Sequence, residues 1–168
     1  SDVCSSDLDK VDDALAPLAT FSQESIQLDA IEALGWRLRH RDGSADVLLR
    51  VLNSGSPQAQ FLAAEALALD GRKDGLAVLM TAVNFMESYD ERRRAILALG
   101  QLADPQALDL LLEIVRDEEH ILRPAAAEAI GHMADTPRAD EIFNLLTSLT
   151  DAHYDLAKGA LVGLRYFG

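Results

Sequence analysis

The chain has 168 residues, of which 49% are hydrophobic and only 5% aromatic, and its formal net charge is −13 at pH 7. This length fits one domain, whose core we expect to consist of Ala, Leu, Ile and Val packed between helices. The lack of any run of 18 apolar residues excludes a membrane-spanning helix, and the acidic charge argues against binding to a phosphate backbone and suits a basic partner.

The first eight residues read SDVCSSDL and include Cys4, the only cysteine of the chain. They lack an initiator Met and a signal-peptide pattern, and DVCSSDL resembles the translation of a sequencing-library adapter, as found in assembled environmental reads. We therefore interpret residues 1–8 as a non-native leader on a metagenomic fragment, and residues 9–168 as a single repeat domain. The cysteine-free remainder is compatible with a reducing cytoplasm, and a reactive thiol at Cys4 is the less favoured alternative.

A five-residue pattern recurs five times after this leader. Its fifth residues stand at positions 35, 68, 100, 131 and 165, so the steps between copies are 33, 32, 31 and 34 residues. A nearly constant period in this range predicts a stack of similar units, each with two helices. The copies are Ile31-Glu32-Ala33-Leu34-Gly35, Ala64-Glu65-Ala66-Leu67-Ala68, Ile96-Leu97-Ala98-Leu99-Gly100, Ala127-Glu128-Ala129-Ile130-Gly131 and Leu161-Val162-Gly163-Leu164-Arg165.

The expected helices follow one another along the chain, and no segment has the alternating pattern of a strand. The first helix covers residues 9–20 and is ended or broken near Pro17. Three later helix starts are predicted by a capping side chain followed by proline: Ser56-Pro57, Asp104-Pro105 and Thr136-Pro137. Before, between and after these starts we expect further helices over residues 25–39, 45–52, 73–83, 90–103, 123–133 and 152–167.

Small residues close four of the five copies. We place Gly35, Gly100 and Gly131 inside helices, because apolar residues continue past each of them. A mid-helix glycine costs about 1 kcal/mol relative to alanine, so its recurrence predicts a close approach of the partner helix in the same unit, with Ala68 in the same role. Pro124 lies seven residues before Gly131, so that helix should either begin near Arg123 or kink there.

The pattern A-x-E-A-(L/I)-G, with its Asp-Pro and Thr-Pro helix starts, resembles HEAT repeats over about residues 20–168. The short period is similar to a bacterial subgroup first named for phycobilisome lyase subunits. The resemblance implies an all-α, right-handed superhelix of about five helical hairpins, most commonly a protein-binding scaffold. Relatives include bilin lyase subunits, DNA-repair glycosylases and a di-iron hydroxylase with His-Glu pairs. This chain has no His-Glu dipeptide and no positive surplus, so neither metal nor DNA chemistry is carried over.

In two-helix solenoids the second helices usually line the concave side. If the second position of the pattern is exposed, residues four before and four after it share that face. Leu28, Phe61, Leu69 and Leu97 also fall on this face, which leaves open that part of it belongs to the core. The candidate partner-binding strip consists of Glu32, Trp36, Glu65, Arg93, Gln101, Glu128, His132 and Tyr166.

Several of these residues also have a purely structural explanation. Trp36 is at least as well explained by packing as by ligand contact, and Tyr166 by simple exposure or by packing at the end of the chain. His132 lies four residues after Glu128, which favours a surface hydrogen bond over a catalytic dyad, since no nucleophile is near. Two readings remain for the run Arg92-Arg93-Arg94: neutralisation by the adjacent acids, or contact with a phosphate or an acidic peptide. No histidine pair has helical metal-site spacing, so we expect no catalytic, metal or cofactor residues.

These observations favour a non-enzymatic, cytoplasmic interaction scaffold whose partner is a protein or peptide, of basic character. The alternative is an enzyme subunit resembling bilin lyase proteins, with His132, Tyr166 and Trp36 near a cofactor. We expect neither nucleic acid nor membrane as a partner. The last helix shows an apolar face without a polar cap, so we expect further repeats, another domain or self-association to cover it. That face consists of Leu156, Leu161, Leu164 and Phe167.

Overall fold

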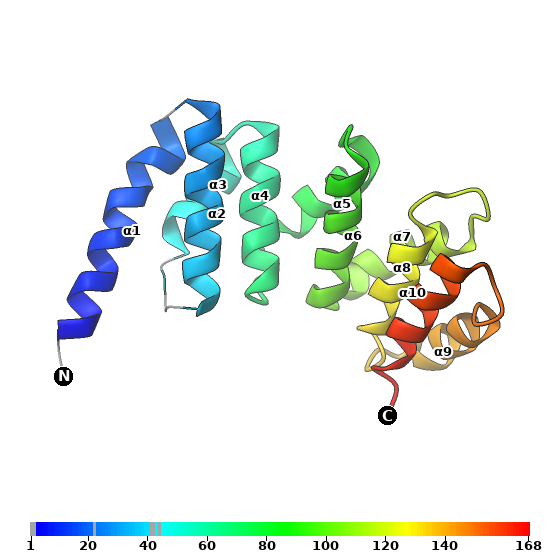
Figure 1. Ribbon diagram of the computed structural model, residues 1–168. Helices are drawn as coiled ribbons and strands as arrows, with labels where there is room; N and C mark the ends of the chain where they lie inside the picture. Colours follow the sequence, from blue (N-terminus) through cyan, green and yellow to red (C-terminus); the bar gives the residue numbers. More distant parts are fainter. Residues whose placement is uncertain (1–2, 22, 41–42, 44) are drawn as a thin grey trace. The chain divides into compact units, whose positions relative to one another are not determined.

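The computed structural model describes residues 3–21, 23–40, 43 and 45–168, with side chains from Lys10 onward except at position 21 (Figure 1). Within these residues the secondary structure is entirely helical, which confirms the predicted all-α fold. The chain divides into two compact units, Ser1–Val78 and Leu79–Gly168. The single domain over residues 9–168 and the non-native origin of residues 1–8 stay predictions.

Ten α-helices and one short 3-10 helix are present in the described part of the chain, alternating between first helices and the helices that carry the recurring pattern. We call α2, α4, α6, α8 and α10 the pattern helices. The elements are α1 (Val3–Phe21), α2 (Glu24–His40), α3 (Asp46–Ser54), α4 (Pro57–Leu69), η1 (Lys73–Gly75), α5 (Leu76–Phe85), α6 (Tyr89–Leu102), α7 (Pro105–Arg116), α8 (Arg123–Gly131), α9 (Ala139–Ser148) and α10 (Tyr154–Leu164).

In the first unit, α2 and α4 lie side by side, α1 packs on α2, and α3 packs on α4. Asp12 on α1 and Arg37 on α2 form an ion pair with 2.6 Å between Oδ1 and Nε, and each side chain is only 12% exposed. This pair ties α1 to α2 where little water screens the charges. The largest fully buried side chains of the unit are Ile31, Leu34, Leu48, Phe61 and Leu67.

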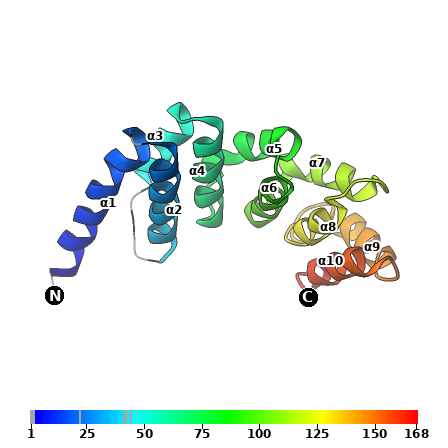
Figure 2. The same ribbon diagram turned by 45° about the horizontal axis from the view of Figure 1, so that its top comes forward.

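In the second unit, α8 is the central helix. It is flanked by α6 and α10 in one layer and covered by α7 and α9 in the other (Figure 2). Glu141 on α9 accepts hydrogen bonds from Arg116 on α7 and from Arg138, which also donates to Asp109 on α7. These charged contacts join α7 to α9. The large side chains fully buried in this unit include Ile96, Leu99, Leu111, Leu112 and Ile130.

Within each unit, neighbouring pattern helices approach closely where the fifth position of a copy is glycine. That glycine meets the third position of the next copy, so close that a Cβ on it would collide with its neighbour. The predicted close approach is confirmed, but the expected partner was wrong: it is the next pattern helix and not the first helix of the same unit. The pairs are Gly35 with Cβ of Ala66 (2.6 Å), Gly100 with Cα of Ala129 (2.7 Å) and Gly131 with Cα of Gly163 (2.3 Å), each distance taken from the added Cβ.

Two of the three capped helix starts are confirmed. Ser56 Oγ accepts a hydrogen bond from the Ala59 backbone N–H at 3.3 Å at the start of α4. Asp104 Oδ1 accepts one from the Gln106 N–H at 3.0 Å at the start of α7. In both helices the proline follows the cap, where it gives up an N–H that had no helical partner.

The Thr136-Pro137 start was wrong, because α9 begins only at Ala139. Thr136 Oγ1 donates to the carbonyl oxygen of Met133 at 2.8 Å, so the hydroxyl is directed back toward α8 and caps nothing ahead of it. For α8 the sequence left two alternatives, a start near Arg123 or a kink at Pro124. The first is confirmed, because the helix begins at Arg123 with Pro124 in its first turn, where proline is tolerated.

The expected end near Pro17 was also wrong, because α1 continues to Phe21. The turn after the proline is held by its packing: Ala19 is fully buried, and the Gln27 side-chain amide donates to the Ala19 carbonyl oxygen at 3.0 Å. These contacts with α2 offset the helical hydrogen bond that proline cannot donate.

Two pattern helices end earlier than predicted, and Gly131 is therefore the last residue of α8 and not a mid-helix residue. The expected ends at positions 133 and 167 lie in tighter turns. The Met133 N–H donates to the Ile130 carbonyl at 3.0 Å, and the Phe167 N–H donates to the Leu164 carbonyl at 3.1 Å. These bonds span three residues, which winds the backbone more tightly than an α-helix.

Candidate partner-binding groove

The second position of the pattern is never buried, whereas its first position is fully buried in four copies. Glu32 is exposed, and Glu65, Leu97, Glu128 and Val162 are half-buried. The helix face chosen from the spacing is therefore the outer one along all five pattern helices. One flanking residue does not belong to this face, since Phe61 is fully buried in the core.

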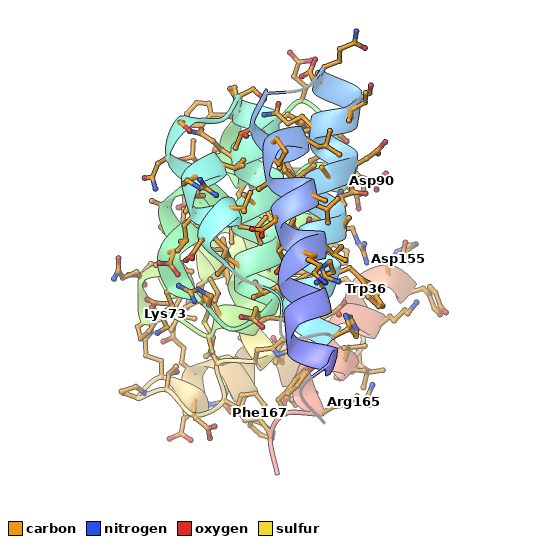
Figure 3. All side chains as sticks on the ribbon, turned by 90° about the vertical axis from the view of Figure 1, so that its left-hand side faces the viewer. Trp36, Lys73, Asp90, Asp155, Arg165 and Phe167 are labelled. Carbon is orange, nitrogen blue, oxygen red and sulfur yellow. The ribbon has the colours of Figure 1, made fainter. Side chains whose placement is uncertain are left out.

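The first unit carries three residues of the predicted strip. Glu32 and Trp36 are exposed on α2, and the Trp36 side chain keeps 48% of its surface accessible. Figure 3 shows the position of Trp36 among the side chains. Its ring stacks on that of His40, one helical turn later, with centroids 4.9 Å apart. Glu65 is half-buried on α4. The packing reading of Trp36 thus holds in part: the indole covers a neighbouring ring and keeps half of its surface open.

A groove of about 400 Å³ crosses the pattern helices of the second unit. Small residues form part of its lining. A Cβ on Gly159 of α10 would lie 2.2 Å from the carbonyl oxygen of Pro124 on α8, so the two backbones touch. The lining comes from α6 (Tyr89, Arg93), from α8 (Pro124, Ala125, Glu128) and the second residue before it (Ile121), and from α10 (Asp155, Lys158, Gly159).

Two cations and two carboxylates line this groove: Arg93, Lys158, Glu128 and Asp155. None of the four makes an ion pair with any residue that the structure describes. By contrast, Arg116, Arg138 and Glu141 on the other layer are fully engaged with one another. The groove is thus electrically balanced within a chain of net charge −13, and its charges are open to a ligand.

Exposed apolar side chains stand at the N-terminal ends of the three pattern helices around this groove. Tyr89 begins α6, Ile121 precedes α8, and Tyr154 begins α10, and the last two are 66% and 73% exposed. Tyr89 and Ile121 line the groove itself. Tyr154 lines a neighbouring pocket of about 370 Å³ together with Leu161 and Val162, and both hollows share Lys158. We call Tyr89, Ile121 and Tyr154 the apolar rim.

His132 and Tyr166 lie together but outside the groove. Their ring centroids are 3.9 Å apart. Burial lowers the pKa of His132, and the negative charge of Glu128 opposes this shift. In this fully described region the two side chains share no hydrogen bond, so the predicted Glu128–His132 bond was wrong; the imidazole packs on the tyrosine ring instead.

The structure therefore divides the predicted strip into parts. Arg93 and Glu128 meet in the groove, His132 meets Tyr166, and Gln101 is exposed near the end of α6 without lining either hollow. The spacing argument missed Tyr89, Ile121 and Asp155. A signal existed for Tyr89 and Asp155, because they precede the second position of their copy by eight and seven residues, about two helical turns within α6 and α10.

The apolar face expected on the last helix is partly covered. Leu156 is buried, and the Phe167 ring lies against that of Phe143 on α9, with centroids 5.5 Å apart. Leu161 is 55% exposed, although the equivalent residue is fully buried in each of the four earlier copies. Coverage of this face by further repeats or by a second copy stays a prediction.

The described residues hold no group of three or more His, Cys, Asp or Glu that could bind a metal ion. None of their helices combines the length and the apolar character needed to cross a bilayer.

Comparison with known proteins gives one family. Residues 45–131 and 86–165 each match the model of a family described as HEAT repeats, and the two overlapping matches cover more than half of the chain. The match does not distinguish the bacterial phycobilisome-lyase-like subgroup. No curated protein matches the chain.

Proposed function

The chain belongs to the HEAT-repeat family, whose members generally mediate protein–protein interaction, and we propose that it is a non-enzymatic scaffold that binds a protein segment along its pattern helices. The binding surface in the second unit is the groove across α6, α8 and α10. It holds Arg93 and Glu128 of the predicted strip, and it extends to the apolar rim.

The observation that carries this proposal is the coexistence of open charges and exposed apolar side chains in the groove and the hollow beside it. Protein interfaces typically combine buried aromatic or aliphatic anchors with polar groups around them. Ile121 and Tyr154 are mostly exposed although they are apolar, and their neighbours Arg93 and Lys158 have no ion-pair partner among the described residues. A partner segment would bury the two apolar side chains and provide opposite charges for the two cations.

No specific observation supports the alternative of an enzyme subunit similar to bilin lyases. That alternative needs a pocket between His132, Tyr166 and Trp36. Neither of the two hollows described in the second unit is lined by His132 or Tyr166. Membership of the HEAT-repeat family does not by itself indicate catalysis, because these repeats serve many unrelated tasks.

A peptide selection tests the proposal. The purified 168-residue chain is used to select binders from a displayed library of random peptides, and hydrogen exchange then locates the protected amides. We expect protection at residues 121–128 and 154–159. The double variant Tyr89→Ala/Ile121→Ser should lose most of the binding, whereas Arg50→Glu, an exposed position on α3, should keep it. Protection confined to α7 and α9, or unchanged binding in the double variant, would show that the groove is not the site.

A further inference from the structure

The charges of the groove are arranged in a way that selects a ligand class. We propose that it binds an extended peptide segment carrying one acidic and one basic side chain beside an apolar residue. This inference rests on the proposed function, since it assumes that the groove receives a protein segment.

The two cations that line the groove indicate the acidic side chain of the bound segment. Arg93 on α6 and Lys158 on α10 each precede the second position of their copy by four residues, so they occupy the same register on helices that flank α8. The equivalent residue of α8 is Pro124, whose side chain carries no charge and no donor. Two positive groups thus line the groove on either side of an uncharged position of the middle helix, and a carboxylate bound there can interact with both.

The basic side chain is assigned by the two carboxylates. Glu128 lies one helical turn beyond Pro124 on α8, and Asp155 lies in the first turn of α10. A purely acidic segment would leave these groups facing its own charges, and a purely basic segment would meet Arg93 and Lys158. Only a segment with both signs finds an opposite charge at every charged lining residue, because like charges brought together at an interface are costly.

The apolar residue is assigned by the rim. Tyr89 and Ile121 line the groove, and Tyr154 continues the rim into the second hollow. Lys158 lines both hollows, so the apolar side chain should stand next to the acidic one in the segment. Burial of an apolar side chain on this rim supplies affinity, while the charges supply orientation.

The free chain does not have to break internal ion pairs to bind such a segment. The four lining charges have no ion-pair partner within the described residues, whereas Arg138 would have to leave both Glu141 and Asp109. A single-stranded nucleic acid offers only negative charge, and it would meet Glu128 and Asp155 in the groove as well as the net charge of −13.

The test uses four synthetic, fluorescently labelled peptides of equal length and equal Leu and Tyr content. One carries Asp and Lys, one Asp and Gln, one Asn and Lys, and one Asn and Gln. With the full chain, fluorescence anisotropy should show that the Asp/Lys peptide binds about tenfold more tightly than either singly charged peptide. The double variant Arg93→Glu/Lys158→Glu should lose this advantage and instead prefer a peptide in which Lys replaces the Asp. Arg50→Glu, with the same kind of charge change on α3, is the matched control and should bind like the unmodified chain.

Several results would overturn the inference. An Asp/Gln peptide or an oligodeoxynucleotide that binds as tightly as the Asp/Lys peptide would show that negative charge alone is recognised. An equal loss for all peptides in the double variant would point to damaged folding or non-specific attraction, and circular dichroism separates these two causes. If all four peptides bind equally and still protect the groove from exchange, charge selection fails while the proposed function stands. If bound peptides protect other helices, the proposed function fails as well.

Discussion

Gly131 and Gly163 bring the backbones of α8 and α10 into direct contact: a Cβ on Gly131 would lie 2.3 Å from the Cα of Gly163 and 2.4 Å from its carbonyl oxygen. The same relation joins Gly100 to Ala129 between α6 and α8. Backbone atoms cannot rotate away as side chains do, so an added methyl group at either glycine forces the two helices apart. The pattern helices therefore depend on missing side chains for their spacing.

Gly131→Ala is expected to destabilise the chain by about 1–3 kcal/mol, the usual cost of inserting a methyl group into a closely packed contact. Urea unfolding followed by circular dichroism measures the change as a lower midpoint. Gly168→Ala is the matched control, since a Cβ there meets nothing within 4 Å and the midpoint should not move. Equal midpoints for the two variants would disprove the backbone contact.

The Asp12–Arg37 pair should contribute more than the exposed pairs of the chain. Removing one partner leaves a charge in a poorly hydrated place, and we expect Asp12→Ala to cost about 1–3 kcal/mol, less than for a fully buried pair. Arg72→Ala breaks an exposed pair with Asp74 and should cost at most about 0.5 kcal/mol. In a double-mutant cycle, Asp12→Ala and Arg37→Ala should be non-additive. Strict additivity would mean that the pair contributes nothing.

Acid should weaken the joint between α7 and α9. Hydrogen bonds from Arg138 and Arg116 lower the pKa of Glu141 from 4.5 to about 2. Because the folded-state pKa lies below the unfolded one, this contribution is present above about pH 4.5 and is lost as the pH falls toward 2. The side chain is exposed, so salt should reduce the shift. An NMR titration of the Glu141 carboxyl carbon measures it directly, and an ordinary pKa in low salt would refute the two hydrogen bonds.

Tyr166 should control the protonation of His132. Burial disfavours the charged imidazolium and lowers its pKa, so the folded chain loses stability as the pH falls from 6.5 through the lowered folded-state value. Tyr166→Ala removes the ring that lies 3.9 Å from the imidazole and should raise the pKa of His132 toward 6.5. An NMR titration of the ring carbons reads this out, with His153, an exposed histidine, as the internal control. An unchanged pKa of His132 in the variant would mean that residues other than Tyr166 bury the imidazole.

The sequence predicted the fold through residues whose role is local. A constant period, Ser56 and Asp104 as caps, and glycines in equivalent places each act within one helix or between near neighbours. The partner of each glycine was harder to predict, because spacing along one chain does not tell whether a helix touches its own hairpin or the next. The structure shows that the glycine at the fifth position of one copy contacts the third position of the next copy, and this pairing could not be predicted from the spacing.

Part of the site was predictable and part was not. Arg93 and Glu128 follow from helical spacing around the second position. Ile121 does not, because it precedes α8 and helical periodicity holds only inside a helix. The predicted helix start at Thr136 was wrong for a similar reason. A threonine before proline can also donate its hydroxyl to a preceding carbonyl oxygen, here that of Met133, and only the three-dimensional turn determines which bond forms.

The contact between Gly159 and Pro124 has a consequence for recognition. Since two backbones meet in the lining of the groove, this part of its surface does not depend on the rotamers of long side chains. A segment that enters meets a preformed surface there, so at this contact the conformational entropy lost on association is mostly that of the segment. Association with a rigid receptor should then show single-step kinetics, with sequence variants of the partner differing mainly in how slowly they leave.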